Sequence, residues 1–129
     1  MRPMEAQRLH ACARERAQEL PGSSMGFPFG PDHEVHKVRG KVFLLMTVLG
    51  GDPVATLKVH PEDSAFLRTA HEDITPGYHM NKRHWITVQP GGEVDEGMLR
   101  DLVAESYLQV VAGLPRRERP VDPDTFGRA

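Results

Sequence analysis

Hydrophobic and polar positions along the chain predict a series of short strands between helices. Residues 6–20 place small and apolar side chains at the spacing of one helix face, with Arg and Glu between them. Pro21-Gly22 ends this helix. The following stretch, 21–32, is rich in Gly, Pro and Ser and predicts a loop, with Phe27 and Phe29 tucked against the domain.

Three strands are expected next. Residues 33–39, 41–49 and 54–59 are rich in β-branched and apolar side chains, and turn-forming residues separate them. The links are Gly40 and the cluster at 50–53. Because such short links join neighbouring antiparallel strands, this part of the chain is predicted to be an antiparallel meander.

The second half of the chain predicts two more helices around an extended segment. His60-Pro61-Glu62-Asp63 suits a helix start, and we expect that helix to run to about residue 72. Residues 78–89 are expected to be extended, with one or two short strands. The last helix has a plausible N-cap at Asp95 and ends near Gly113.

These elements predict an α+β fold in the order α-β-β-β-α-β-(β)-α, with helices on one face of an antiparallel sheet. Residues 1–114 are expected to form a single domain. Residues 115–129 mix Arg, Pro and Asp without periodicity and predict a flexible tail.

Composition agrees with a small globular domain. The chain has 129 residues, of which 39% are hydrophobic and 26% charged. Cys12 is the single cysteine, which excludes an internal disulfide and a Cys-rich zinc site and fits the reducing cytoplasm. We expect no signal peptide, and no apolar run approaches the roughly 20 residues that span a bilayer.

Strand alternation predicts one basic and aromatic surface. If Val38, Ile86 and Val88 face the helices, neighbouring cationic side chains and one indole point to the opposite face. With the adjacent turn, this set comprises Lys37, Arg39, Lys58, Lys82, Arg83 and Trp85. Because Lys and Arg neutralise phosphates and an indole stacks on bases, the surface suits nucleic acid. An outward Trp that bridges Arg side chains is the structural alternative.

The net charge of −2 limits this hypothesis, because strong non-specific binders of nucleic acid usually carry a large positive excess. Binding must therefore come from a local patch. A second cluster, which is either a hydrogen-bonded turn or a ligand pocket, comprises Tyr78, His79, Asn81 and His84.

Metal binding and catalysis receive little support. The sequence has seven His, but His33 and His36 lie three apart and fall on opposite faces of a strand. No phosphate-binding Gly loop, nucleophile elbow or Cys–His arrangement of known spacing is present. We therefore expect no metal, no cofactor and no enzymatic activity.

Several segments together resemble the YjbR/MmcQ family, and the resemblance covers almost the whole chain apart from the tail. The most specific part is Pro-Gly-Tyr followed by Asn-Lys-Arg-His-Trp. One departure is His36, where the resemblance implies an aromatic residue. The matching segments are HEVHKVRGKVFLLM (His33–Met46), LKVHPEDSAFLR (Leu57–Arg68), ITPGYHMNKRHWITV (Ile74–Val88) and SYLQVVAGLP (Ser106–Pro115).

This resemblance implies a frataxin-like α+β fold, similar also to a double-wing domain of a phage transcription factor. Members are commonly called DNA-binding proteins on the strength of that likeness, which is an analogy between folds. We therefore expect binding of nucleic acid, with duplex DNA as the partner. The alternative is a module that binds a protein or a small anion. The sequence leaves open whether the protein forms a homodimer.

Overall fold

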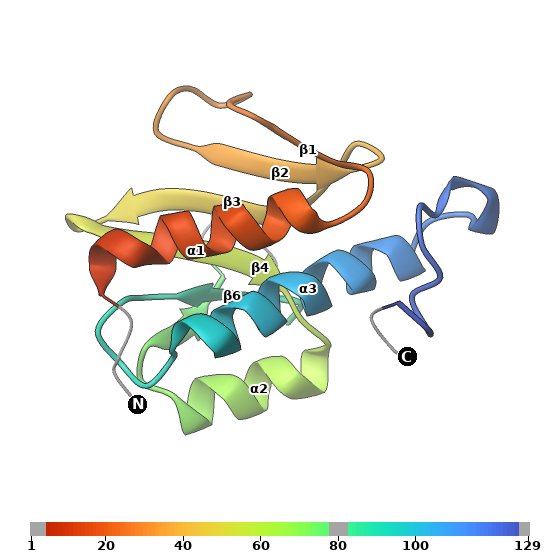
Figure 1. Cartoon of the computed structure of the whole chain (residues 1–129). Coiled ribbons are helices and arrows are strands. Elements are labelled where there is room, and N and C mark those ends of the chain that lie inside the picture. Colours follow the sequence, from red (N-terminus) through yellow and green to blue (C-terminus); the bar gives the residue numbers. More distant parts are fainter. Residues whose placement is uncertain (1–4, 78–82, 127–129) are drawn as a thin grey trace.

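A computed structural model describes residues 5–77 and 83–126 of the chain. Six antiparallel strands form one sheet in the order β1-β2-β3-β4-β6-β5, and three helices cover one face of it (Figure 1). The fold class is therefore the α+β arrangement predicted from the sequence. The strands are β1 Ser23–Gly26, β2 Glu34–Val38, β3 Lys41–Leu49, β4 Asp52–Lys58, β5 Ile74–Pro76 and β6 Trp85–Val88.

The helices begin and end where the sequence places their signals. They are α1 Ala6–Glu19, α2 Pro61–Ala70 and α3 Glu96–Ala112, followed by a short 3-10 helix, η1, at Arg116–Glu118. The carboxylate of Asp95 accepts a hydrogen bond from the backbone N–H of Met98 at 2.8 Å, which confirms the predicted cap of α3. At the start of α2, the His60 ring accepts from the backbone N–H of Glu62 at 3.4 Å.

Strand β1 was missed by the sequence analysis, which predicted a loop over residues 21–32. Its Ser- and Gly-rich composition lacks strand signals, but it pairs with β2 along four positions, from Ser23↔Val38 to Gly26↔Val35. The placement of two aromatic side chains was also wrong. Phe27 is 49% exposed and Phe29 is 69% exposed, so neither is tucked against the domain.

The core lies between the sheet and the helices, and strand alternation selects its residues as predicted. Val38, Ala55 and Leu57 point toward the helices and are fully buried, as are Ile86 and Val88. Phe43 departs from simple alternation, because the register between β2 and β3 shifts between His36 and Lys37. The shift turns Phe43 toward α3, where its ring meets the edge of the Tyr107 ring at 5.4 Å.

The segment predicted as a flexible tail has a defined place beside α3. The ring of Phe126 packs 6.1 Å from the ring of Tyr107, and Val121 also contacts the core. Arg119 donates hydrogen bonds to the carbonyl oxygens of Leu114 (2.9 Å) and Ala112 (2.8 Å). The segment is therefore attached to the domain by two apolar side chains, Val121 and Phe126, and by the hydrogen bonds of Arg119.

Within the described ranges, none of the helices is long and apolar enough to cross a membrane.

Candidate functional site

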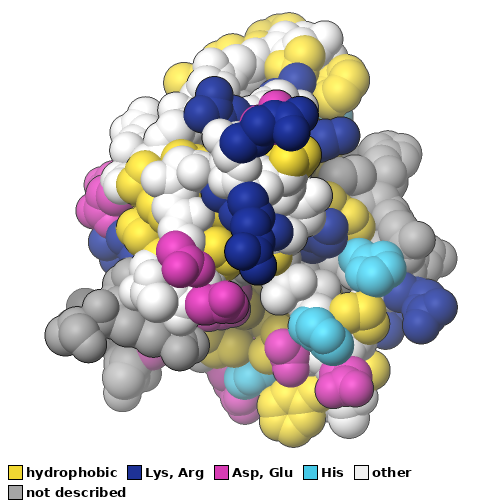
Figure 2. All heavy atoms as spheres, turned by 90° about the vertical axis from the view of Figure 1, so that its right-hand side faces the viewer, with side chains coloured by type: hydrophobic (Ala, Val, Ile, Leu, Met, Phe, Trp, Pro, Cys, Tyr) yellow, Lys and Arg dark blue, Asp and Glu magenta, His cyan; other side chains and the backbone are white. Residues whose placement is uncertain are grey.

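Basic side chains collect at one end of the sheet, where β2 and β4 end and β3 and β6 begin. The antiparallel order brings these four strand ends together beside the C-terminus of α3. The sequence has four lysines, and the three that the structure describes, Lys37, Lys41 and Lys58, all lie here. Figure 2 views the molecule from this side and shows Lys and Arg side chains gathered along the middle of the face.

Arginines extend this group of charges. Arg83 is exposed two residues before Trp85, and Arg39 occupies the turn between β2 and β3. Exposed Arg116 and Arg117 follow α3 in η1. We refer to these residues together as the basic end of the molecule, which comprises Lys37, Arg39, Lys41, Lys58, Arg83, Arg116 and Arg117.

Arg39 lies in the turn and not on the strand face that alternation assigned to it. Its backbone has a φ of 51°, a left-handed conformation, and Gly40 follows with a φ of 78°. Its guanidinium Nε donates to the carbonyl oxygen of Glu118 at 2.8 Å. This contact joins the β2–β3 turn to η1 and so connects the lysines with Arg116 and Arg117.

Lys58 and Trp85 are direct neighbours, as strand alternation predicted. They are Cα partners in the register between β4 and β6, so their side chains emerge on the same side of the sheet. The buried hydroxyl of Ser106 on α3 fixes this strand end. It accepts a hydrogen bond from the backbone N–H of Lys58 at 2.7 Å and donates to the carbonyl oxygen of Phe43 at 2.6 Å.

A hollow of about 340 Å³ opens beside this pair. Trp85 and two lysines contribute its aromatic and cationic parts, and aliphatic residues of β3 and of the end of α3 contribute the rest. The lining residues are Lys41, Val42, Lys58, Trp85, Val110, Gly113 and Leu114. The sequence analysis did not include Lys41 in the predicted surface. The available signal was its position directly after the Arg39-Gly40 turn, close in sequence to Lys37 and Arg39.

The basic end differs from the helical side of the molecule in how its charged side chains are paired. Arg8 bonds Glu96 at 2.9 Å, Arg14 bonds Glu34 at 2.7 Å and Arg100 bonds Glu19 at 2.6 Å. Among the described residues, no carboxylate forms an ion pair with Lys37, Lys41 or Lys58. Although the net charge of the chain is −2, the positive charges of Lys37, Lys41 and Lys58 therefore lie together at one end of the sheet.

The face of the sheet away from the helices is not the open platform that the sequence analysis assumed. Thr56 and Thr87 lie on that face and are 0% and 1% exposed, with their hydroxyls 2.9 Å apart. Val35 and Leu45 are buried there too, and they lie outside the cluster that forms the core. The basic residues therefore occupy the end of the sheet and not a broad basic face.

Three residues of the predicted ligand pocket, Tyr78, His79 and Asn81, lie outside the described residues, as does Lys82 of the predicted nucleic-acid surface. His84 is half-buried, and its carbonyl oxygen accepts from the backbone N–H of Val59 at 2.8 Å, which continues the pairing of β4 with β6.

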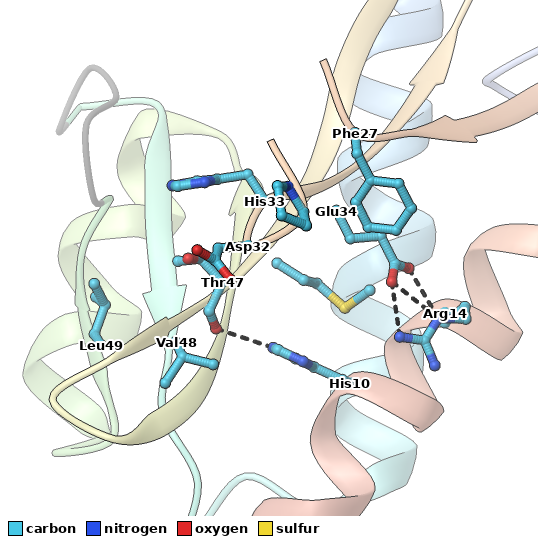
Figure 3. A pocket seen from close by; sticks show the side chains of 11 residues that line it. His10, Arg14, Phe27, Asp32, His33, Glu34, Thr47, Val48 and Leu49 are labelled. Atoms are coloured by element: carbon cyan, nitrogen blue, oxygen red, sulfur yellow. Dashed lines mark hydrogen bonds and ion pairs between the residues drawn. The ribbon is translucent and has the colours of Figure 1, made fainter. Parts of the chain in front are cut away.

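A larger hollow, of about 580 Å³, lies between α1, the β1–β2 loop and β3 (Figure 3). An ion pair at its base joins Arg14 of α1 to Glu34 of β2, and His36 approaches the same carboxylate at 2.8 Å. Burial alone would raise the pKa of Glu34, but hydrogen bonds from Arg14 and His36 outweigh it and hold the pKa below its usual value. This cluster joins helix to sheet.

His36, the departure from the family pattern, is 1% exposed and belongs to this internal network. It faces the helices and is not available for stacking on a ligand. In the part of the chain that is described, no three His, Cys, Asp or Glu side chains are grouped so that they could hold a metal ion.

Solved structures share this architecture. A crystal structure of a Deinococcus radiodurans protein with a DUF419 domain is 38% identical, with a TM-score of 0.75, and the match covers 82% of this chain and 81% of that one. A Pseudomonas syringae protein is 28% identical with a TM-score of 0.63, over 80% of this chain and 96% of the other.

Sequence relatives agree with the structural comparison. The Escherichia coli O157:H7 protein YbdF is 45% identical over 116 residues, which is 90% of this chain and 95% of YbdF. YjbR of Escherichia coli K12 is 36% identical over 83 residues, 64% of this chain and 70% of YjbR. The profile of the YjbR family matches residues 18–109. The chain therefore belongs to the YjbR family.

Proposed function

We propose that this protein binds nucleic acid, and DNA in particular, through its basic end. The observation that carries the proposal is the separation of charge: Lys37, Lys41 and Lys58 share one end of the sheet without a described carboxylate partner. Ammonium groups in this state can neutralise phosphates and release condensed counterions, which is the main source of sequence-independent affinity for nucleic acid.

The end of α3 would oppose an anion if its carbonyl groups were unsatisfied, because the C-terminus of a helix carries partial negative charge. Arg119 offsets this effect. Its guanidinium bonds the carbonyl oxygens of Ala112 and Leu114, and Arg116 and Arg117 add two exposed positive charges nearby. With Glu118 also exposed in η1, Arg116, Arg117 and Arg119 still leave a net positive charge at the end of α3, which favours a phosphate there.

We infer that DNA is bound at the end of the sheet, and not across the sheet face that the sequence analysis predicted. On the face that alternation predicted as the binding surface, Thr56 and Thr87 are buried. Lys58 and Trp85 are neighbours at the edge of that face. Arg83 stays among the proposed contacts because it is exposed next to this edge.

The proposal is tested by fluorescence anisotropy of labelled DNA titrated with the full chain at 50 and 200 mM salt. If about three phosphates are contacted, affinity should fall roughly 40-fold between these concentrations, since the slope is about 0.9 per contact. A labelled acidic peptide of similar length serves as the control for attraction to any polyanion.

Binding that is tighter for DNA than for the peptide and that weakens with salt supports the proposal. Failure to bind DNA at tens of micromolar in 50 mM salt would refute it. Equal affinity for the peptide would instead indicate a protein-interaction or small-anion module.

A further inference from the structure

The hollow at the basic end combines three kinds of surface. Trp85 contributes an indole, Val110 and Leu114 contribute aliphatic side chains that are each 7% exposed, and Lys41 and Lys58 contribute ammonium groups. Its volume of about 340 Å³ lies at the lower end of the range for small-ligand sites, roughly 300–1,000 Å³. It is therefore suited to a small unit that is flat, apolar on its faces and attached to negative charge.

The backbone of Trp85 is fixed by the sheet. Trp85 pairs with Lys58, and the carbonyl oxygen of Trp85 accepts from the backbone N–H of Gly77 at 2.9 Å. A side chain at Gly77 would collide with Trp85, since a Cβ there would lie 2.5 Å from the Trp85 Cβ. The Cα–Cβ bond of Trp85 therefore has a defined direction, toward the side of the sheet from which Lys58 also emerges.

A nucleobase with its phosphate fits these features. Base stacking on aromatic side chains tolerates any sequence, because every base has a π-face, and flanking lysines neutralise the backbone. A base inside a duplex is covered on both faces by its neighbours, so only an unpaired base can reach such a ring.

We propose that the hollow beside Trp85 receives one unpaired base, so that the protein prefers single-stranded over duplex DNA. This inference rests on the proposed function and specifies its ligand. It replaces the duplex that the family resemblance implied, and the filled sheet face at Thr56 and Thr87 agrees with it, because a duplex has no open sheet surface there on which to lie.

The sequence contains a single tryptophan beside two tyrosines, so fluorescence excited selectively at the indole, beyond the absorption of tyrosine, reports on this hollow. The full chain is titrated at 50 mM salt with three labelled probes of about 20 nucleotides: oligo-dT, a duplex, and a strand of abasic sites that has phosphates without bases. Anisotropy of the label measures binding, and indole emission measures stacking.

We expect oligo-dT to bind tightest and to quench the indole, and the abasic strand to bind more weakly without quenching. Trp85→Leu should weaken oligo-dT binding by roughly 5- to 150-fold and leave the abasic strand within about 2-fold. Because Trp85 is half-buried, circular dichroism must first show that this variant is folded; the abasic comparison needs no variant.

Equal affinity for all three probes with unchanged indole emission would overturn the single-strand inference while leaving the proposed function in place. Tighter binding of the duplex than of oligo-dT would also overturn it. If none of the three probes binds, both the inference and the proposed function are wrong.

Discussion

At the scale of single residues, Ser106 connects α3 with two strands beside the basic end. Its hydroxyl is buried and bonds both the backbone N–H of Lys58 and the carbonyl oxygen of Phe43. Ser106→Ala would leave both backbone groups without a partner inside the protein. We expect it to lower the free energy of unfolding by about 2 kcal/mol in urea denaturation. Exposed Ser24 is the matched control, and Ser24→Ala should change it by less than about 0.5 kcal/mol.

Glu34 gives a prediction about pH. Arg14 and His36 hold its pKa below the ordinary 4.5 against the opposing effect of burial. A carboxyl whose folded pKa is lowered stabilises the protein above its unfolded pKa, and this contribution disappears as the pH falls through the folded pKa. Glu34→Gln should cost about 2 kcal/mol at pH 7, and the difference from wild type should narrow below pH 4.5. A difference that stays constant from pH 7 down to the acid limit of folding would contradict this account.

At the scale of elements, the C-terminal segment is predicted to stabilise the domain. Phe126 packs near Tyr107 from a segment with few other apolar residues. Because Phe126 is only partly buried, we expect Phe126→Ala to lower the free energy of unfolding by about 1–2 kcal/mol, less than for a fully buried Phe. Phe29, 69% exposed, provides the control, and Phe29→Ala should have little effect. Equal effects of the two variants would show that the segment contributes no packing energy.

The same elements show how far sequence patterns reach. Apolar, β-branched composition between turn residues was sufficient to predict β3 and β4, and a carboxylate cap was sufficient to predict the start of α3, because these signals act locally. Strand β1 could not be predicted, because its stability comes from pairing with β2 and its own residues carry no strand signal. The direction of the Phe43 side chain could not be predicted for a similar reason, since a register shift between β2 and β3 decides which way it points.

At the scale of the whole molecule, the candidate site was predicted only in part. Alternation within two strands predicted that Lys58 and Trp85 share a face, whereas their direct pairing depends on β4 and β6 being neighbours in the sheet. The position of Lys41 beside Lys58 and Trp85 depends on which strand ends meet, and the lack of described ion pairs at the three lysines depends on where the carboxylates lie in the fold. Both are properties of the assembled fold. The net charge of −2 is a sum over the chain, so it gives no information on where the lysines and the carboxylates lie relative to one another.

The central claim, that DNA is held by the basic end, is tested most directly by two double variants that remove the same charge from different places. Lys41→Ala/Lys58→Ala removes two unpaired charges from the basic end, and Arg8→Ala/Arg68→Ala removes two arginines from α1 and α2. Anisotropy of labelled oligo-dT is measured for each variant at 50 and 200 mM salt. If two of about three phosphate contacts are lost, the decrease in affinity over this salt range should shrink from roughly 40-fold to roughly 4-fold in the lysine variant. The arginine variant should keep the wild-type slope, whereas equal losses in both variants would contradict the account.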